Sequence, residues 1–196
     1  VTVIVKERFE PEIRVAYSKL EFANSADEVE HPIVKEALKV HGIDSHIEII
    51  SLGDLPSGTG LGSSGAFTVA LLGALTAFKT QTDWDIPETA YNLERKTLNR
   101  MTGRQDHYAA YFAGIKAYSL TQDGIIDHTF VKNGDLVNHL SLFYTGRTRS
   151  SVKILEEVNK ADDIMVQIKE IGRQSYHALK YMDFTEFGKL LHEHWM

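Results

Sequence analysis

Hydrophobic and polar positions alternate through much of the first fifty residues, as they do in half-buried β-strands. Residues Val1–Lys6 and Glu12–Ser18 show this alternation, and we expect them to form neighbouring strands. The run His46–Leu52 predicts a further strand. Residues His31–His41 predict a short helix, because a proline stands in the first turn and a glycine follows the end.

Helical patterns become more frequent after this point. Residues Ser63–Lys79 are apolar on nearly every side, which predicts a buried helix. A second helix begins at Asp85, where Glu88 completes a capping-box pattern, and it contains Glu94. Strands early in the chain and helices late favour the α+β fold class. The other expected elements are a helix at Gln105–Ala113, strands near Ile115–Leu120, Ile125–Val131 and His139–Tyr144, and helices at Ser150–Asn159, Asp162–Tyr181 and Asp183–Met196.

Composition restricts the class of protein. The chain has 196 residues, enough for one large domain or one and a half, and a net charge of −6. This charge, without a cluster of lysine or arginine, argues against non-specific binding of nucleic acid. The absence of cysteine excludes a disulfide framework and fits a reducing compartment such as the cytoplasm. We expect no membrane span, and we expect further residues upstream because Val1 already begins a strand pattern.

A glycine-rich segment, Leu55–Ala66, leads into the buried helix. The first N–H groups of a helix have no intrahelical acceptor and the helix dipole is positive there, so the segment predicts a site for an anion such as phosphate. Glycine permits positive φ and close approach, and serine can cap the helix or offer a hydroxyl to a phosphate-bound metal. The residues expected to contribute are Pro56, Gly58, Gly60, Leu61, Gly62, Ser63 and Ser64.

Two common phosphate-binding loops do not fit this segment. A P-loop has a lysine directly after its last glycine, and none follows here. Gly60, Gly62 and Gly65 match the letters of a dinucleotide-binding fingerprint, but that fingerprint needs its first glycine in a tight turn at the end of the strand. Here residues 53 to 59 lie between the end of the strand, Leu52, and Gly60. A glycine-rich turn without a ligand is the remaining alternative.

Phosphoryl transfer also needs a divalent metal and a group that orients the attacking hydroxyl. Ser64 and Glu94 could share one Mg²⁺, which prefers oxygen ligands; a solvated helix glutamate is the alternative for Glu94. Asp106, in the first turn of an expected helix, could orient the hydroxyl and accept its proton, and a charge that favours the helix dipole is its alternative. We expect Arg104 to keep Asp106 ionised.

Residues Pro56 to Ser64 resemble the second motif of the GHMP kinases, Pro-x-x-x-Gly-Leu-Gly-Ser-Ser. Gly65 departs from the Ala or Ser of many members, and we expect it to leave space near the phosphates. Residues 103–110 are similar to the Gly-Lys-Gln-Asp-Gln-Tyr-Ala-Ala segment of the D-glycero-D-manno-heptose 7-phosphate kinases, a branch of that family, with Arg104 for Lys and His107 for Gln. Other segments similar to this branch are 13–19, 31–34, 143–146 followed by Arg149, and 190–195.

The resemblance implies a GHMP-kinase-type fold. Residues 1–145 would form an ATP-binding, ribosomal-protein-S5-domain-2-like α/β domain, and residues 146–196 the helical start of a C-terminal domain. An N-terminal Gly-Gly-Gly-Thr-Asp segment and a C-terminal glycine-rich motif of the family are absent. The chain therefore resembles the central portion of such a kinase.

The resemblance also assigns roles within the site. Asp106 corresponds to the catalytic aspartate, Ser64 and Glu94 to the magnesium ligands, and residues 58–64 to the loop around the ATP phosphates. Arg149 and Arg104 are candidate contacts to the sugar phosphate; an arginine in solvent at the start of a helix is the alternative for Arg149.

The function that the resemblance implies is transfer of the γ-phosphoryl group of ATP to the anomeric hydroxyl of a heptose 7-phosphate, with Mg²⁺. Such an enzyme would be cytoplasmic, would bind neither nucleic acid nor a membrane, and would be compatible with a homodimer. It would serve the synthesis of nucleotide-activated heptose for lipopolysaccharide, capsule or S-layer glycan. The alternatives are another GHMP kinase, acting on galactose, fucose or a mevalonate-type alcohol, and a non-catalytic protein of the same fold that binds nucleotide and sugar.

Overall fold

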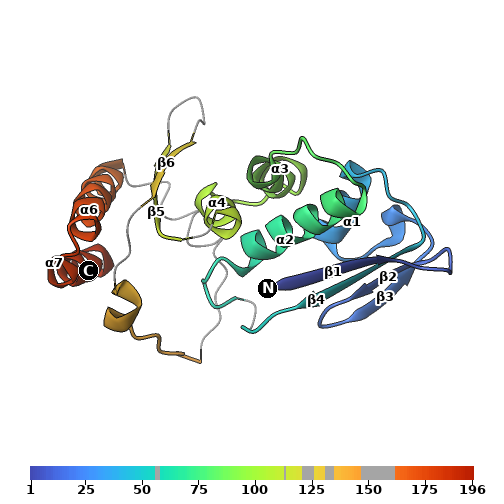
Figure 1. Ribbon diagram of the computed structural model, residues 1–196, viewed down its shortest axis with the longest axis horizontal. Helices are drawn as coiled ribbons and strands as arrows, with labels where there is room; N and C mark the ends of the chain where they lie inside the picture. The colour runs from blue at the N-terminus through green and yellow to red at the C-terminus, as the bar shows by residue number, and fades with distance from the viewer. Residues whose placement is uncertain (56–57, 113, 121–125, 131–134, 147–161) are drawn as a thin grey trace. The chain divides into compact units, whose positions relative to one another are not determined.

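The computed structural model describes residues 1–55, 58–112, 114–120, 126–130, 135–146 and 162–196 (Figure 1). Within these residues the chain divides into two compact units. One contains residues 1–112, and the other contains residues 114–146 and 162–196. Neither unit contains a helix among its described residues that is long and apolar enough to cross a membrane.

A four-stranded mixed sheet forms one layer of the first unit. Its strands are β1 (Thr2–Glu7), β2 (Ile13–Ala16), β3 (Leu20–Ala23) and β4 (Ile47–Leu52), in the order β1-β4-β2-β3. The prediction that β1 and β2 are neighbours is wrong, because β4 lies between them, antiparallel to β1 and parallel to β2. The reason is the crossover: after the β2–β3 hairpin the chain passes through a helix, which lets β4 return parallel to β2.

Five helical elements accompany this sheet. They are α1 (Pro32–Val40), α2 (Ser63–Phe78), α3 (Ile86–Asn92), the π-helical turn η2 (Leu93–Thr97) and α4 (Gln105–Tyr111), besides a short 3₁₀ turn, η1 (Ala26–Glu28). Helices α1 and α2 lie over the same face of the sheet, and α2 contacts β1, α1, α3 and α4 (Figure 1). This central position confirms the buried helix expected from its apolar surface. The core between the layers contains Ile13, Val15, Ile33, Val34, Leu38, Ile47, Ile49, Leu71, Leu72 and Leu75.

Side-chain caps begin two of these helices; the sequence predicts the one at Asp85, whereas the one at His31 was not expected. His31 Nδ1 accepts from the backbone N–H of Val34 at the start of α1. The carboxylate of Asp85 accepts from the backbone N–H of Glu88 at 3.2 Å at the start of α3. Each cap satisfies a donor that would otherwise lack a partner in the first turn.

A buried glutamate connects the three strands β1, β4 and β2. Glu48 is 6% exposed, its neighbours in register are Lys6 and Arg14, and it forms ion pairs with both, at 3.0 Å to Lys6 Nζ. The hydrogen bond from Lys6, together with the nearby charge of Arg14, lowers the pKa of Glu48 below its ordinary value despite its burial.

We expect Glu48→Gln to lower the free energy of unfolding by about 1 kcal/mol at neutral pH, since it removes two cross-strand ion pairs. Because the folded state lowers the pKa of this carboxyl, its contribution is present above the unfolded value and is lost as the pH falls through the folded value. Urea unfolding at pH 7 and pH 3 tests this. The difference between wild type and variant should shrink at pH 3, and an equal difference at both pH values would contradict the assignment.

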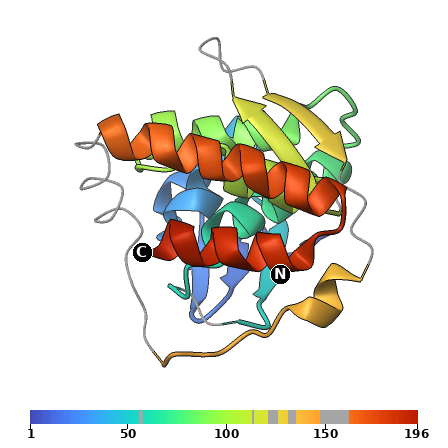
Figure 2. The same cartoon turned by 90° about the vertical axis from the view of Figure 1, so that its left-hand side faces the viewer.

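The second unit contains a hairpin and two packed helices. Strands β5 (Lys116–Leu120) and β6 (Ile126–Phe130) pair antiparallel, and η3 (Leu136–His139) is a 3₁₀ turn. Helices α6 (Asp162–Lys180) and α7 (Phe184–Trp195) lie side by side, as Figure 2 shows. The carboxylate of Asp183 accepts from the backbone N–H of Glu186 at 2.9 Å, so the predicted cap at this position is confirmed. The helix expected at Ser150–Asn159 lies outside the described residues.

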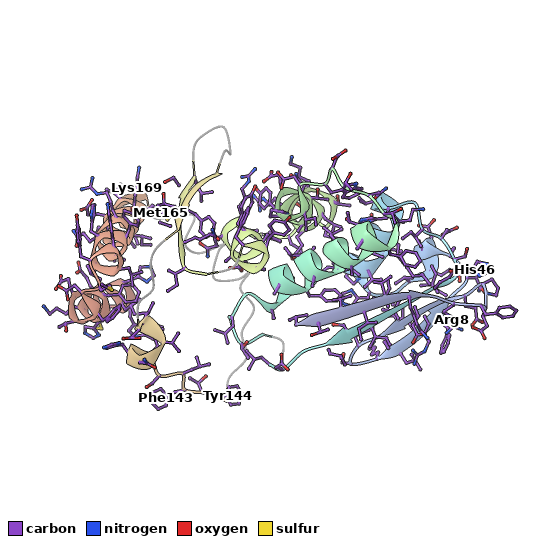
Figure 3. The ribbon with its side chains drawn as sticks, in the orientation of Figure 1. Arg8, His46, Phe143, Tyr144, Met165 and Lys169 are labelled. Atoms are coloured by element: carbon purple, nitrogen blue, oxygen red, sulfur yellow. The ribbon has the colours of Figure 1, made fainter. Side chains whose placement is uncertain are left out.

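The strand expected at His139–Tyr144 is not formed. The 3₁₀ turn η3 ends at His139, and the residues that follow it pair with no strand among those described. Phe143 and Tyr144, labelled in Figure 3, are 83% and 69% exposed. An alternating pattern produces a strand only where a partner accepts its backbone hydrogen bonds, which explains the wrong prediction.

Candidate active site

The glycine-rich segment has the backbone conformation that its composition predicts. Gly58, Gly60 and Gly62 have φ angles of 77°, 80° and 68°, in the left-handed region that favours glycine. Gly62 is the N-cap of α2, and no side chain caps this end, so neither predicted serine acts as the cap. Thr59 Oγ1 is buried in the loop and has no hydrogen-bond partner among the described residues. The loop therefore ends at a helix N-terminus that exposes backbone donors.

The other expected loop residues lie around this N-terminus. Ser63 is the first residue of α2, Ser64 is the second, and Leu61 is 54% exposed just before the N-cap. Pro56 lies outside the described residues. The structure therefore brings the two serines to the position where a phosphate would meet the helix.

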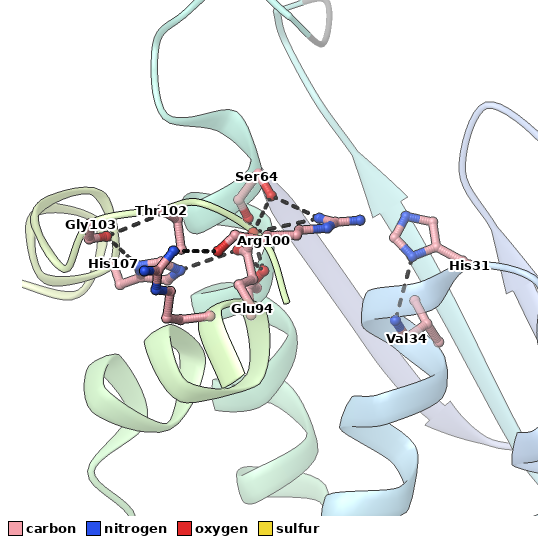
Figure 4. Close-up of polar contacts among 10 residues, drawn as sticks. His31, Val34, Ser64, Glu94, Arg100, Thr102, Gly103 and His107 are labelled. Atoms are coloured by element: carbon pink, nitrogen blue, oxygen red, sulfur yellow. Dashed lines mark hydrogen bonds and ion pairs between the residues drawn. The ribbon is translucent and has the colours of Figure 1, made fainter. Parts of the chain in front are cut away.

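The carboxylate of Glu94 is the centre of a polar cluster beside this helix (Figure 4). Glu94 is 3% exposed. Ser64 Oγ donates to Oε2 at 2.8 Å, Thr68 Oγ1 donates to Oε1 at 2.7 Å, and His107 Nε2 lies 3.2 Å from Oε1. Arg100 Nη1 adds a longer contact of 3.5 Å to Oε2. The structure thus brings together Ser64 and Glu94, the two expected magnesium ligands.

Hydrogen bonds keep this buried carboxylate ionised. Burial alone would raise the pKa of Glu94, but donors from His107, Thr68 and Ser64 outweigh it and lower the pKa to about 2. The alternative of a solvated helix glutamate does not hold, because the side chain is buried and satisfied within the protein.

The backbone at Glu94 departs from a regular α-helix. Helix α3 widens into the π turn η2, in which the N–H of Leu98 donates to the carbonyl of Leu93, five residues earlier. Such π turns occur frequently at functional sites. The sequence predicted one uninterrupted helix here, because hydrophobic periodicity does not reveal a change in the hydrogen-bond register.

Helix α4 brings Asp106 against the glycine loop. A methyl group on Gly62 would lie 3.3 Å from Asp106 Cγ, and one on Gly65 would lie 3.0 Å from Asp106 Cβ and 3.4 Å from the backbone nitrogen of His107. Gly65 therefore allows α4 to pack against α2, and the space that we expected it to leave near the phosphates is occupied by α4. Asp106 thus lies at the same helix N-terminus as Ser64.

Arg104 has a different environment from the one expected. Its Nε and Nη2 atoms form a bidentate ion pair with Glu88, each at 2.9 Å, and its guanidinium stacks over Tyr91 at 4.1 Å. Among the described residues it makes no ion pair with Asp106, so the expectation that Arg104 holds this aspartate ionised is not supported. Arg149, the other candidate contact to sugar phosphate, lies outside the described residues.

Three residues of the cluster were not expected from the sequence. Thr68 lies one turn after Ser64 on α2, so i,i+4 spacing could have indicated that the two hydroxyls share a face. His107 follows the singled-out Asp106 and is fully buried, and Arg100 follows the π turn. No sequence signal connects these last two with Glu94.

The donor set fits the groups that the sequence suggests. An ionised carboxylate and a hydroxyl 2.8 Å apart offer the oxygen ligands that Mg²⁺ prefers, and the unpaired Thr59 hydroxyl and the N-terminus of α2 offer donors to phosphate. Mg²⁺ usually keeps several waters and binds one or two carboxylates plus substrate phosphates. Such a site needs no larger group of His, Cys, Asp or Glu, and none occurs among the described residues.

We expect Gly62→Ala to lower the free energy of unfolding by about 1–2 kcal/mol, because alanine is strained at a φ of 68°. It should also reduce turnover, because the added methyl group presses on Asp106. Gly42→Ala is the matched control: its φ is 60° and nothing lies within 4 Å of the added carbon. Denaturant unfolding should show similar losses for both variants. Equal turnover in both would argue against the contact with Asp106.

Comparison with known proteins finds a family model that matches the first unit. Residues 18–114, which include the loop, Glu94 and Asp106, match the family model of the GHMP kinases N terminal domain. Just under half of the chain therefore matches the N-terminal domain of the GHMP kinases. The resemblance seen in the sequence and the predicted α+β class are therefore confirmed.

Individual GHMP kinase relatives are more distant. The chain is 28% identical to D-glycero-alpha-D-manno-heptose 7-phosphate kinase of Campylobacter jejuni over 155 residues, 72% of this chain and 46% of the relative. It is also 28% identical to L-fucokinase/L-fucose-1-P guanylyltransferase of Bacteroides fragilis over 200 residues, 93% of this chain and 21% of the relative. The chain thus spans less than half the length of these curated relatives.

Solved structures of GHMP kinases share the fold. A D-glycero-D-manno-heptose 1-phosphate kinase from Bacteroides thetaiotaomicron superposes with a TM-score of 0.77 at 23% identity, covering 98% of this chain and 65% of that chain. At this identity the likeness concerns the fold alone.

Proposed function

We propose that this chain belongs to a sugar kinase of the GHMP type that transfers the γ-phosphoryl group of ATP to the anomeric hydroxyl of a heptose 7-phosphate. The observation that carries the proposal is the convergence of three groups at the N-terminus of α2: the glycine loop, the Ser64–Glu94 pair and Asp106. Phosphoryl transfer needs a phosphate cradle, a metal site and a group that orients the acceptor. In this proposal the glycine loop is the phosphate cradle, the Ser64–Glu94 pair is the metal site, and Asp106 orients the acceptor.

Each group has a separate role in this proposal. Residues 58–64 hold the ATP phosphates through backbone N–H groups. Ser64 and Glu94 hold Mg²⁺, which offsets the negative charge of the phosphates when bound. Asp106 orients the acceptor hydroxyl and accepts its proton, while the close contact with Gly62 and Gly65 holds it in position.

The choice of acceptor rests on residues 103–110 and on the heptose 7-phosphate kinase among the relatives. In this reading Arg104 and Arg149 contact the sugar phosphate, and the bidentate pair with Glu88 holds Arg104 in one orientation. The product would serve the synthesis of nucleotide-activated heptose for a surface glycan. We place residues 1–145 in the ATP-binding domain and residues 146–196 at the start of the C-terminal domain.

A coupled assay of ADP release against a panel of acceptors tests the function. The panel contains heptose 7-phosphate, galactose, L-fucose and mevalonate, each with ATP and Mg²⁺. We expect heptose 7-phosphate to give the highest kcat/KM. Binding of nucleotide without ADP release on any acceptor would identify a non-catalytic protein of this fold and overturn the proposal.

L-Fucose is the second candidate acceptor, because the relative whose name includes L-fucokinase aligns with 93% of this chain at the same identity. The same panel decides between the two sugars. A kcat/KM for L-fucose that exceeds the value for heptose 7-phosphate would move the assignment to that sugar.

The site of action and the assembly are also proposals. We place the kinase in the cytoplasm, where ATP is available and where a chain without cysteine is at no disadvantage. We propose a homodimer, which light scattering of the purified protein at several concentrations tests directly.

A further inference from the structure

Arg100 is a partly exposed cation at the edge of the Glu94 cluster. Its side chain is 35% exposed and follows the π turn η2. Nη1 lies 3.5 Å from both Ser64 Oγ and Glu94 Oε2. Both contacts are long and therefore weak for hydrogen bonds. Glu94 already has three shorter contacts, from Ser64, Thr68 and His107. Stabilising the carboxylate of Glu94 therefore uses little of the charge and few of the hydrogen-bond donors of Arg100.

The remaining donors of Arg100 have no partner in the part of the chain that the structure describes. A guanidinium carries five N–H donors in a planar fork, and within the described residues the Nε and Nη2 atoms make no hydrogen bond or ion pair. Figure 4 shows the guanidinium extending from Ser64 towards His31. Such a fork matches the geometry of phosphate and carboxylate oxygens.

His31, towards which the Arg100 guanidinium points, has several contacts that hold its ring in place. Its Nδ1 accepts from the backbone N–H of Val34 at 3.4 Å, and its own backbone N–H donates to Glu21 at 3.3 Å. Its ring packs edge-on against Tyr17 at 4.9 Å and tilted against Phe67 at 5.2 Å between centroids. These contacts fix the ring orientation.

The cap also determines which nitrogen of His31 is a donor. Because Nδ1 accepts a hydrogen bond, the proton of the neutral ring is on Nε2, and Nε2 has no partner among the described residues. Burial lowers the pKa of His31 below its ordinary value, and the charge of Arg100 adds to this against the opposing effect of Glu21. His31 thus presents one free N–H donor on a fixed ring.

We propose that Arg100 and His31 form an oxyanion subsite beside Ser64 that binds a phosphate group of a substrate. Arg100 supplies the charge and a fork of donors, and His31 Nε2 supplies one neutral donor. The phosphate comes either from the terminal position of the nucleotide or from the phosphorylated sugar. The subsite rests on the proposed kinase function and adds a cation to the groups at the N-terminus of α2.

Isothermal titration of the purified protein with four probes tests the subsite. AMP-PNP and ADP differ by the terminal phosphate, and heptose 7-phosphate and unphosphorylated heptose differ by the sugar phosphate. The variants are Arg100→Gln, Arg100→Lys and His31→Asn, since asparagine preserves the helix cap while removing Nε2. Lys96→Gln is the matched control, because Lys96 is exposed on η2 and its replacement removes the same charge.

We expect Arg100→Gln to lower the affinity for one phosphorylated probe at least about tenfold more than the affinity for the matching probe without that phosphate. For His31→Asn we expect the same kind of loss, of about threefold. Arg100→Lys should retain part of the affinity. A loss confined to AMP-PNP assigns the nucleotide phosphate, and a loss confined to heptose 7-phosphate assigns the sugar phosphate. Two results would overturn the subsite. One is that Arg100→Gln leaves the affinity difference within each pair of probes unchanged; the other is that Lys96→Gln loses as much affinity as Arg100→Gln.

Failure of the subsite and failure of the kinase function give different results. Normal ADP release by the wild type, with AMP-PNP and heptose 7-phosphate binding insensitive to Arg100, overturns the subsite alone. AMP-PNP binding that depends on Arg100, without ADP release on any acceptor, overturns the kinase function alone. Far-UV circular dichroism of each variant confirms folding, and Arg100→Lys replaces Arg100→Gln if the latter does not fold.

Discussion

Asp106→Asn is expected to reduce kcat at least ~100-fold while ATP still binds, which is the usual scale for the loss of a general base. Asparagine preserves the size of the side chain and its contact with Gly62 and Gly65 but removes the charge and the ability to accept a proton. The change is confined to the step in which the acceptor hydroxyl attacks. Steady-state ADP release and titration with AMP-PNP measure the two effects separately.

Asp83→Asn is the control for this prediction, since Asp83 is an exposed aspartate before α3 whose carboxylate accepts a hydrogen bond from Thr82 Oγ1. It should leave kcat unchanged. Asp106 also stands in the first turn of α4, where its charge favours the helix dipole by about 0.3–1 kcal/mol. Reduced stability with wild-type turnover in Asp106→Asn would therefore assign a purely structural role to this residue.

Glu94→Gln is expected to affect both stability and activity. An amide in this position places an NH₂ group among donors from Ser64, Thr68 and His107, and it removes the charge partner of Arg100. Leaving buried donors unpaired should lower the free energy of unfolding by about 2–4 kcal/mol. A neutral amide is also a poorer Mg²⁺ ligand, so Mg²⁺-dependent turnover should fall about 100-fold. Urea unfolding and ADP release at several Mg²⁺ concentrations measure the two effects.

Glu48→Gln is the matched control for Glu94→Gln. Glu48 is likewise buried and ion-paired, but its partners are Lys6 and Arg14 on the sheet. It should lose stability and retain kcat. If Glu94→Gln kept wild-type kcat and its dependence on Mg²⁺, Glu94 would be a structural glutamate, and the magnesium site would have to be sought elsewhere.

The helices and their ends could be predicted because their determinants are local. The predicted caps Asp85 and Asp183 act within three residues of the groups that they bind, so a short window of sequence contains the whole interaction. The strand order could not be predicted in this way. Which strand separates β1 from β2 depends on the path of the chain between β2 and β4, and alternation is the same in either order.

The misassigned contacts of Arg104 have a similar cause. Proximity in sequence suggested Asp106 as its partner, but the two residues are only two apart on the edge of a helix and do not face each other. Glu88, sixteen positions earlier, is the partner in space. Neighbours along the chain are therefore a poor guide to ion pairs unless the helical spacing is three or four.

The sequence by itself predicted a phosphate-binding loop, the resemblance to the GHMP kinases, and the candidates Ser64, Glu94 and Asp106, because glycine conformation, helix starts and motif spacing are properties of contiguous residues. Only the tertiary structure decided that Glu94 is buried and ionised, and that it gathers Ser64, Thr68 and His107 from 30, 26 and 13 positions away. Such contacts depend on how α2, η2 and α4 pack, and no single window of sequence contains them.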